Sequence, residues 1–557
     1  MKMNGAEIVI RILEAHGIDV VTGIPGGANL PLYDAIHRRK MRHVLARHEQ
    51  GAGFIAQGMA RSTGKPAVCI ATSGPGATNL ITAIADARMD SVPLIAITGQ
   101  VPSALMGSDA FQEVDIYQMT ISIVKHNFIA RSPEELLRIL PDAFTIATSG
   151  RPGPVLVDIP RDVQLAEIDC EIPSPVRTAF DTEDLSGDID EALRIIARAE
   201  RPVIYAGGGM NSTRGAAALT DLARRANIPV TLTLSGLGAF PPDDGLYLGM
   251  IGMHGTPTAN MAIDRSDCVI ALGVRFDDRA IGRLDSYARN ASIIHADIDR
   301  VELDKIRKCA LSVECDAADF ASSLASRVTA KDGGWIESLR SHRKEYAYPV
   351  RDPAKHDHPA NIIRGIGEML SPDTIITTDV GQHQMWCAQV LRMRHPRSFL
   401  TSGGLGTMGF GLPAAIGASL ANPGITVACV SGDGSILMNI QELITLAELS
   451  LPVKIFVINN RHLGLVRQQQ ELFYGARYSA CAFERTVDYA RAAESFGIRG
   501  ISVDSITESE EIIRGELRSG EPVLFDIRAS SDDNVLPMVP PGEANINMLG
   551  GGYSRLS

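Results

Sequence analysis

The feature that most constrains the fold of this 557-residue chain is a repeated local pattern. A short run of β-branched residues leads through a glycine or proline turn into a segment with apolar residues at helical spacing. Residues 68–71 before Ser73-Gly-Pro-Gly76, and residues 94–98 before Gly99, are two such units. Because strands that alternate with helices form parallel sheets covered on both faces, the pattern predicts an α/β protein with doubly wound sheets.

Two stretches of linker-like composition divide this pattern into three parts. Residues 170–185 are polar and contain proline, and residues 330–359 contain Lys331-Asp-Gly-Gly334. Such composition is typical of connections between elements, and a chain of this length exceeds what one hydrophobic core supports. We therefore predict three doubly wound parallel-sheet domains, at residues 1–165, 187–330 and 355–545. Further strands are expected at residues 155–159, 202–206, 268–272, 293–294, 374–378, 426–430 and 453–458.

Charge and composition exclude several classes of function. The formal net charge of −12 is spread along the chain without a basic stripe, so no nucleic-acid partner is expected. The first twenty residues mix charged and apolar residues, unlike a signal or transit peptide, and the longest apolar runs are too short to cross a membrane. The eight cysteines include no CxxC pair. We expect a chain that starts directly with a folded domain, is not membrane-bound, and works in the cytoplasm with free thiols.

The strongest local signal lies in the last third of the chain. Gly432-Asp433-Gly434-Ser435 follows one predicted strand, and Asn459-Asn460 follows the next. Apolar residues at three- and four-residue intervals predict one helix over residues 436–447. A strand, helix and strand in this order place the two strand ends side by side, where open α/β sheets bind their ligands.

The residue types at these strand ends suit a magnesium ion and a diphosphate. A carboxylate, a carboxamide oxygen and a main-chain carbonyl are ligands that Mg²⁺ accepts. Gly434 and the following helix N-terminus allow main-chain N–H groups to reach a phosphate. The tetrapeptide alone could be an ordinary turn, and Asn459-Asn460 a helix cap. Their spacing between two apolar strands favours the metal site.

This site is similar to that of the thiamine-diphosphate enzymes, and further motifs narrow the resemblance. Over almost its whole length the chain resembles the large, catalytic subunits of the acetolactate (acetohydroxyacid) synthase family. The motifs that carry this resemblance are Gly23-Ile-Pro-Gly-Gly27, Arg47-His-Glu-Gln-Gly-Ala-Gly-Phe-Ile-Ala-Gln-Gly-Met-Ala-Arg61, Ser73-Gly-Pro-Gly-Ala-Thr-Asn79, Asp109-Ala-Phe-Gln-Glu-Val-Asp115, Arg275-Phe-Asp-Asp-Arg279 and Gly403-Gly-Leu-Gly-Thr-Met-Gly-Phe-Gly-Leu-Pro413.

The resemblance implies roles for residues around thiamine diphosphate and Mg²⁺. Glu49 would exchange a proton with the aminopyrimidine ring, and burial would raise its pKa for that task. Met408 would hold the cofactor bent, bringing its two rings together. Outside this context Glu49 could be a surface glutamate and Met408 core filler. The other implied contacts are Gly26, Gln382, His383, Gly434, Ser435 and His462 for thiamine diphosphate, and Asp433, Asn460 and the main chain of His462 for the metal.

The resemblance also implies FAD in the middle domain. Gly207-Gly-Gly209 after a strand would let the main chain approach a phosphate, and Arg275-Phe-Asp-Asp-Arg279 argues against the FAD-free catabolic acetolactate synthases. The implied FAD contacts are Arg151, Gly207, Gly208, Gly209, Met253, His254, Arg275, Asp297 and Asp316.

Substrate contacts follow from the same resemblance. Phe111, Gln112 and Lys125 would line the pocket, and the planar guanidinium of Arg279 would bind the carboxylate of a second 2-oxo acid. Each could instead be a surface charge or a cap. Gln469 departs from the family, in which Trp is common here and rewards the longer 2-oxobutanoate. We therefore expect little preference for 2-oxobutanoate over pyruvate.

The reaction implied is decarboxylation of pyruvate and condensation with a second pyruvate, giving acetolactate, or with 2-oxobutanoate, giving acetohydroxybutanoate. Both products lead to branched-chain amino acids. At least a homodimer with shared active sites is implied, and a small regulatory subunit is possible. An FAD-dependent pyruvate oxidase is the main alternative. Glyoxylate carboligase is disfavoured by Glu49, and a binding protein without turnover is disfavoured by intact Glu49, Asp433 and Asn460.

Overall fold

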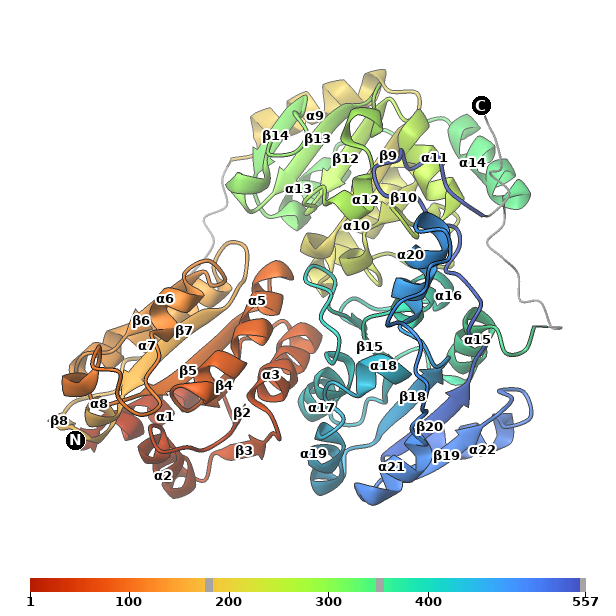
Figure 1. The fold of residues 1–557 in the computed structure, drawn as a ribbon. Coiled ribbons are helices and arrows are strands. Elements are labelled where there is room, and N and C mark those ends of the chain that lie inside the picture. Colours follow the sequence, from red (N-terminus) through yellow and green to blue (C-terminus); the bar gives the residue numbers. More distant parts are fainter. Residues whose placement is uncertain (176–183, 347–354, 551–557) are drawn as a thin grey trace.

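The computed structural model describes residues 1–175, 184–346 and 355–550, which form three domains (Figure 1). Each domain contains a six-stranded parallel sheet with helices on both faces. The predicted fold class, three doubly wound parallel-sheet domains, is confirmed. A small antiparallel pair, β1 (Lys2–Asn4) with β8 (Glu167–Asp169), ties the start of the chain to the end of the first domain.

The first sheet has the strand order β3-β2-β4-β5-β7-β6. Its central strands are buried along their whole length, as expected where helices cover both faces. Helices α1, α2 and α7 cover one face, and α3 and α5 lie on the other. The elements are β2 Val20–Gly23, β3 Arg42–Leu45, β4 Ala67–Ala71, β5 Leu94–Gln100, β6 His126–Ile129, β7 Val155–Pro160, α1 Gly5–Ala15, α2 Leu30–Arg39, α3 Glu49–Thr63, α4 Pro75–Asn79, α5 Ile81–Met89, α6 Ile116–Thr120, α7 Pro133–Thr148 and α8 Arg161–Leu165.

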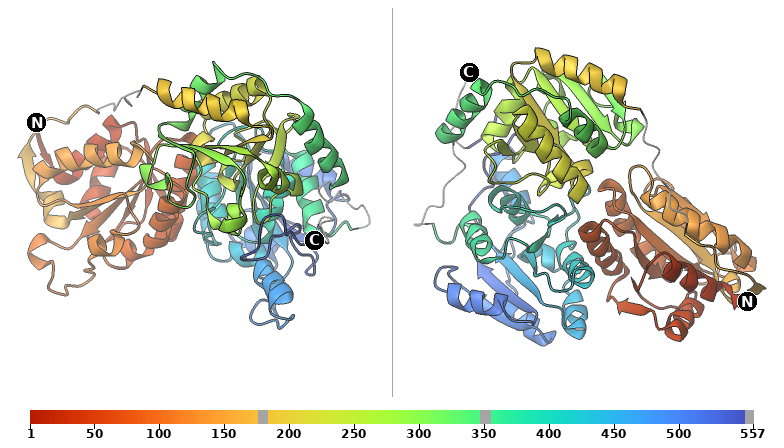
Figure 2. Two further views of the ribbon diagram at one scale, coloured as in Figure 1. Left: turned by 90° about the horizontal axis from the view of Figure 1, so that it is seen from above. Right: turned by 180° about the vertical axis from the view of Figure 1, so that it is seen from behind.

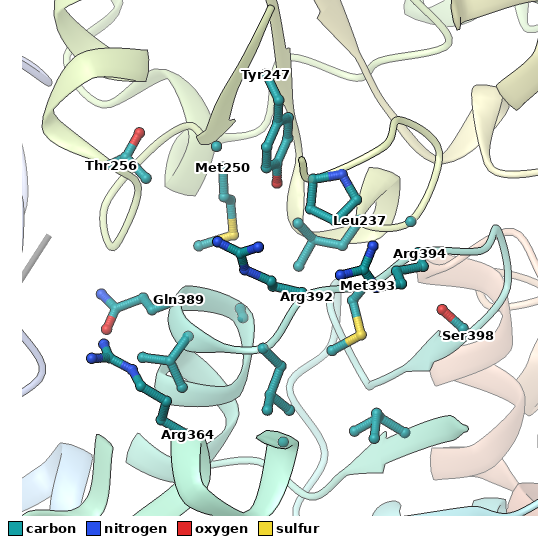
Figure 3. Close-up of a pocket in the computed structure, with 18 of the residues that line it drawn as sticks. Leu237, Tyr247, Met250, Thr256, Arg364, Gln389, Arg392, Met393, Arg394 and Ser398 are labelled. Carbon is teal, nitrogen blue, oxygen red and sulfur yellow. The ribbon is translucent and has the colours of Figure 1, made fainter. Parts of the chain in front are cut away.

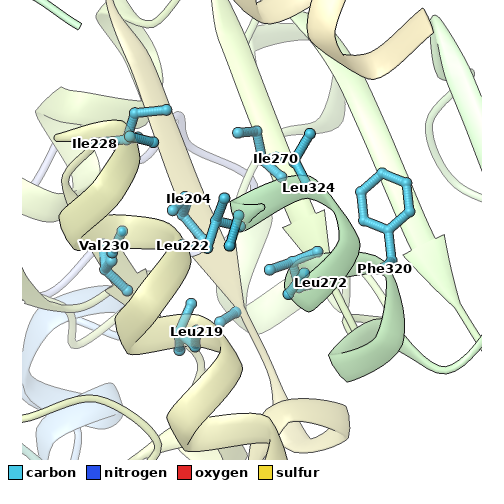
Figure 4. Packing of buried hydrophobic residues seen from close by; sticks show 14 of the residues in the cluster. Ile204, Leu219, Leu222, Ile228, Val230, Ile270, Leu272, Phe320 and Leu324 are labelled. Atoms are coloured by element: carbon cyan, nitrogen blue, oxygen red, sulfur yellow. The ribbon is translucent and has the colours of Figure 1, made fainter. Parts of the chain in front are cut away.

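The middle sheet has the order β11-β10-β9-β12-β13-β14. Figure 4 shows Leu219 and Leu222 of α10 and Phe320 of α13 packed over Ile204 and Leu272 of the sheet. The elements are β9 Pro202–Ala206, β10 Val230–Leu232, β11 Tyr247–Met250, β12 Cys268–Leu272, β13 Ser292–Asp297, β14 Leu311–Glu314, α9 Ser186–Arg198, α10 Thr213–Ala226, α11 Pro257–Arg265, α12 Asp278–Ile281 and α13 Ala317–Ala325.

The predicted second linker, residues 330–359, is wrong in part. It contains helix α14 (Gly334–Glu345), which buries Ile336 and Leu339 against the middle domain. Lys331-Asp-Gly-Gly334, which suggested a linker, precedes the helix and supplies its N-cap and first residue. Residues 347–354, and residues 176–183 of the first linker, lie outside the described residues.

The third sheet has the order β16-β15-β17-β18-β20-β19. The helix predicted over residues 436–447 is two helices, α18 and α19, because the chain makes a turn between Leu437 and Gln441. The elements are β15 Ile375–Thr378, β16 Phe399–Leu400, β17 Val427–Gly432, β18 Val453–Asn459, β19 Arg499–Val503, β20 Val523–Arg528, α15 Pro359–Met369, α16 Gln382–Val390, α17 Gly411–Ala421, α18 Asp433–Ile436, α19 Glu442–Leu449, α20 Gly464–Phe473, α21 Tyr489–Ser495 and α22 Glu510–Leu517.

The first and third domains meet through α3 and α17, which lie side by side in both views of the interface (Figures 1 and 2). Two glycines permit this close approach. A Cβ atom on Gly58 would lie 2.1 Å from the carbonyl oxygen of Ala414, and one on Gly417 would lie 1.9 Å from that of Ile55. Larger residues at either position would therefore force the helices apart.

After β20 the chain leaves the third domain and packs on the middle one, as the dark blue segment of Figure 1 shows. The main-chain N–H of Val539 donates to the carbonyl of Met253 over 2.8 Å, and Asn545 Nδ2 donates to the carbonyl of Ala280 over 2.8 Å. The predicted third domain, residues 355–545, thus includes a terminal segment that serves the middle domain.

All eight cysteines are free thiols, as predicted. Among the residues that the structure describes, no helix is both long and apolar enough to span a bilayer.

Candidate active site

The carboxyl ends of β17 and β18 bring Asp433 to the turn that holds Asn460. The two strands are parallel neighbours, with Gly432 opposite Ile458. The main-chain N–H groups of Gly434 and Arg461 favour the charged form of the Asp433 carboxyl and lower its pKa, which opposes the effect of burial. Sequence spacing had predicted this approach, because adjacent parallel strands end at the same edge of a sheet.

Both side chains are buried, at 4% exposure for Asp433 and 7% for Asn460. Burial raises the pKa of Asp433 to about 7. The Asn460 side-chain oxygen accepts the main-chain N–H of His462 over 3.1 Å, and its Nδ2 donates to Gln382 Oε1 over 3.3 Å. A carboxylate, an amide oxygen and nearby main-chain oxygens are a donor set that fits Mg²⁺, and a bound cation would offset the cost of burying the Asp433 charge.

The N-terminus of α16 adds a buried ring beside these strand ends. Burial lowers the pKa of His383 to about 3, so the ring is neutral. Its Nε2 atom has no hydrogen-bond partner among the described residues. Cβ atoms on Gly381 and Gly432 would lie 2.7 and 2.8 Å from the ring, so glycines wall its niche. An orphaned buried polar atom is what a bound polar group would satisfy, and in this respect the residues fit a diphosphate.

Two other residues predicted to contact the cofactor at this edge, Gln382 and Ser435, form hydrogen bonds within the protein. Gln382 Nε2 donates to Gln468 Oε1 and to the carbonyl of Asp533, both over 3.0 Å. The Ser435 hydroxyl accepts the main-chain N–H of Gly432 over 3.1 Å. A Cβ on Gly434 would lie 2.7 Å from the Leu463 side chain and 3.0 Å from that of Phe483, so a larger residue would require these side chains to shift.

Glu49 is the first residue of α3 and is half-buried. Asn79 Nδ2 donates to its Oε2 over 3.0 Å, and a Cβ on Gly76 would lie 3.3 Å from its Oε1. Gly26 lies against Thr72, where a Cβ would meet the threonine side chain at 2.6 Å. The motif with Gly76 and Asn79 therefore contacts the Glu49 carboxylate, and Thr72 connects Gly76 to Gly26 of a third motif.

Met408 lies half-buried in the glycine-rich loop between β16 and α17. Its neighbours on both sides are fixed. The main-chain N–H of Thr407 donates to Ser402 Oγ over 2.8 Å, and that of Gly409 donates to Asp379 Oδ1 over 2.7 Å. The loop thus presents Met408 from two anchored positions.

The glycines predicted for FAD also shape the middle sheet. Cβ atoms on Gly207 and Gly209 would lie 2.3 and 2.8 Å from the main chain of Gly273, so these glycines let β9 and β12 end close together. Gly208 has more room, with Ser235 at 3.4 Å. Gly208 and Gly209 are exposed at this edge, whereas Gly207 is buried.

Two arginines predicted for FAD link the middle domain to the first. Arg151 Nη1 contacts Glu302 Oε1 at 2.7 Å and Asp299 Oδ2 at 3.2 Å. Arg275 Nη1 donates to the carbonyl of Met89 over 2.7 Å. Both guanidinium groups hold the domain interface in the single chain.

The remaining residues predicted to contact FAD differ in whether their polar groups already have partners within the protein. Burial raises the pKa of Asp297 to about 6, and His254 is buried with its Nδ1 lacking a partner among the described residues. The main chain of Met253 is bonded to Arg279 and Val539. Asp316 caps α13 and pairs with Arg214, which accounts for it structurally.

Several of the predicted substrate residues are exposed in the single chain. Phe111 is 89% exposed, and the side chain of Arg279 is 67% exposed. Gln112 has a φ of +60° and places its main chain against Gly74. Gln469 is exposed on α20.

The Lys125 side chain binds main-chain carbonyls at the end of a helix. Its Nζ donates to the carbonyl of Ser149 over 2.7 Å and to that of Ile146, at the end of α7. A cation there complements the negative end of the helix. Burial lowers its pKa, and the ammonium is bound at the helix end.

Sequence analysis assigned no role to several residues that order the site: Asp379, Asn439, Gln468, Arg61, Asp86 and Asp90. Their partners lie far away in the chain, so no local spacing marks them.

A separate cavity of about 750 Å³ lies between the middle domain and α15 and α16 (Figure 3). Leu237, Met250 and Met393 form apolar parts of its wall, and Arg392 and Arg394 line it as well. Of the predicted site residues only His254 borders it, so the candidate active site lies elsewhere.

Comparisons with known proteins agree with this geometry. The chain matches the thiamine pyrophosphate enzyme family in three parts: the N-terminal TPP binding domain over residues 3–119, the central domain over residues 189–324, and the C-terminal TPP binding domain over residues 379–527. Fold and strand-end site therefore define a thiamine pyrophosphate enzyme.

Similar proteins show which family of thiamine pyrophosphate enzymes the chain belongs to. The chain is 48% identical to the acetolactate synthase isozyme 1 large subunit of Escherichia coli, covering 99% of this chain and 98% of the relative. It is 45% identical to the isozyme 2 large subunit of the same organism, covering 98% and 99%. A probable acetolactate synthase large subunit of Methanocaldococcus jannaschii is 45% identical, covering 98% and 95%. The chain belongs to the acetolactate synthase large-subunit family.

Proposed function

We propose that this chain is the catalytic subunit of an acetolactate synthase that uses thiamine diphosphate, Mg²⁺ and FAD. It condenses pyruvate with a second pyruvate or with 2-oxobutanoate, the first common step toward valine, leucine and isoleucine. The observation that carries the proposal is the buried pair of Asp433 and Asn460 at adjacent strand ends, in a chain with Glu49 at the start of α3. The relatives support a synthase and not the alternative pyruvate oxidase.

Thiamine diphosphate, when bound, supplies the electron sink for decarboxylation and carbon–carbon bond formation. The Asp433 carboxylate, the Asn460 side-chain oxygen and the His462 carbonyl would hold Mg²⁺. The His383 ring and the Gly434 N–H would bind the diphosphate, which satisfies the buried His383 Nε2 atom.

Glu49 would hold and return the proton that the reaction moves on the aminopyrimidine ring. Asn79 orients its carboxyl group through Oε2, which leaves Oε1 for the ring nitrogen. Met408 would press against the cofactor from its anchored loop, so that the two cofactor rings meet in a reactive geometry.

Arg279 would bind the carboxylate of the second 2-oxo acid through its planar guanidinium. The exposure of Arg279 and Phe111 in the single chain supports a working unit in which a second copy completes the site. A homodimer with shared active sites is therefore part of the proposal. So is a small regulatory subunit, because several relatives are named large subunits.

The test is acetolactate formation by the purified protein with pyruvate, Mg²⁺, thiamine diphosphate and FAD, followed by acid conversion to acetoin. In a Glu49→Gln variant we expect kcat to fall on the order of 10²-fold or more, because general acid–base catalysis contributes about this much. The matched control is Glu337→Gln, whose side chain is 66% exposed on α14. Acetate or reduced flavin in place of acetolactate would contradict the proposal and support the oxidase.

A further inference from the structure

The loop that carries Met408 is held from outside its own domain by a buried cluster of the first domain. Asp86 lies on α5, Asp90 ends that helix, and Arg61 lies on α3, the helix that begins with Glu49. Their side chains are 0%, 4% and 11% exposed. The proposed chemistry does not use them, although burying three charged groups is costly.

Arg61 joins both acids to both ends of the loop. Its Nη2 contacts Asp86 at 2.7 Å and its Nη1 contacts Asp90 at 2.9 Å. The same Nη1 donates to the carbonyl of Thr401 over 3.0 Å, and the guanidinium lies 4.9 Å above the ring of Phe410. Thr401 and Phe410 are the residues where the loop begins and ends.

Asp90 fixes the first turn of the loop. Its two carboxylate oxygens accept the main-chain N–H groups of Gly403 and Gly404, over 2.9 and 2.8 Å. The preceding residue, Met89, accepts the Arg275 guanidinium from the middle domain. All three domains are therefore tied together at this one turn.

Asp86 fixes the part of the loop next to Met408. It accepts the hydroxyl of Ser402 and, over 3.3 Å, that of Thr407. Ser402 Oγ in turn accepts the main-chain N–H of Thr407. Because Gly409 is anchored within the third domain, Met408 is left with little freedom to move.

We propose that Asp86, Asp90 and Arg61 are positioning residues, which set the place of Met408 and hence the geometry in which the cofactor reacts. The loop includes Gly406 and Gly409, with φ of +70° and +90°, and glycine-rich segments are conformationally permissive. The cluster supplies the restraint that the loop sequence lacks. This inference rests on the proposed function, in which Met408 contacts the cofactor.

The experiment compares Asp90→Asn and Ser402→Ala with wild type, using the full chain with its cofactors. Asp142→Asn is the matched control, because Asp142 forms an exposed ion pair with Arg138. We expect kcat to fall on the order of 10- to 100-fold while the pyruvate KM stays within about threefold, because the loss is in positioning and not in uniform binding.

Two further measurements do not depend on turnover. Calorimetry gives the Kd of thiamine diphosphate with Mg²⁺, which we expect to stay within about threefold of wild type, since the diphosphate and metal residues are unchanged. Limited proteolysis with chymotrypsin reports cleavage after Leu405, which is 43% exposed. Both variants should be cut there faster than wild type and Asp142→Asn, because the released loop opens locally.

Wild-type kcat in both variants would overturn the proposal, and so would a fall in kcat without faster cleavage after Leu405. If Asp90→Asn fails to fold, Ser402→Ala decides, because it removes one hydroxyl and no charge. A wild-type protein that forms no acetolactate would contradict the proposed function instead. The cleavage comparison would then still measure whether the cluster restrains the loop.

Discussion

Asp158 is a carboxyl group buried in β7 without a cationic partner among the groups that shift it. Thr98 Oγ1 and Gln100 Nε2 donate to it over 2.6 and 3.1 Å. Burial nevertheless raises its pKa from 3.8 to about 7, and the charge of Asp115 acts in the same direction. The folded protein therefore holds a proton here that the unfolded chain releases at lower pH.

A raised carboxyl pKa gives stability that is fully present below the unfolded value of 3.8 and is lost as pH rises through about 7. We predict that Asp158→Asn, which is neutral at every pH, gains stability relative to wild type as pH rises from 5 to 8. Thermal unfolding midpoints of both proteins across this range measure the difference. Asp142→Asn should keep a constant difference from wild type. A constant difference for Asp158→Asn as well would show that Asp158 does not titrate there.

The side chain of Gln469 is expected to affect which second 2-oxo acid, pyruvate or 2-oxobutanoate, the enzyme prefers. It is exposed on α20 in the single chain, and it offers little apolar surface to the extra methylene of 2-oxobutanoate. We predict that wild type uses pyruvate and 2-oxobutanoate about equally in competition, and that Gln469→Trp shifts the ratio toward 2-oxobutanoate by about fivefold, since one buried methylene is worth about 1 kcal/mol. Strong selection for 2-oxobutanoate by wild type would refute this prediction.

At the scale of elements, the packing of α3 on α17 depends on the absence of side chains. Gly417→Ala would place a Cβ against the Ile55 carbonyl. We predict a loss of about 1–3 kcal/mol in stability, typical of overpacking, together with reduced kcat, because α3 carries both Glu49 and Arg61. The control is Gly515→Ala in α22, where a Cβ meets nothing within 4 Å and stability should rise by about 0.5–1 kcal/mol. Equal thermal midpoints for the two variants would contradict this account.

Local sequence patterns were sufficient to predict most strands and to predict that Asp433 and Asn460 follow neighbouring strand ends. Buried parallel strands such as β17 and β18 are mostly apolar, with the buried Lys454 as an exception in β18, and Asp433 and Asn460 follow directly at their carboxyl ends. The turn between α18 and α19 could not be predicted, because Ile440 and Leu443 keep helical spacing across it. The contact of Asp86 and Asp90 with the loop was equally hidden, since their loop partners Ser402, Gly403 and Gly404 lie more than three hundred positions away.

In the proposed homodimer, each active site would take Glu49 from one copy and Asp433 from the other. Mixing Glu49→Gln with Asp433→Asn chains in equal amounts, with subunit exchange, tests whether each site uses both copies. If it does, half of the dimers are mixed and each of these has one intact site. Activity should then recover to about one quarter of wild type, although each variant alone is inactive. Sites built within one chain would give no recovery, which would contradict the shared-site proposal.

The terminal segment that packs on the middle domain bears on how the chain is made. Residues up to Cys315, including every strand of the middle sheet, leave the ribosome well before Val539 and Asn545. The main chains of Met253 and Ala280 can therefore form these hydrogen bonds only after Val539 and Asn545 have been synthesised. A chain that terminates early, near residue 535, would have three complete sheets and a middle domain without these two hydrogen bonds.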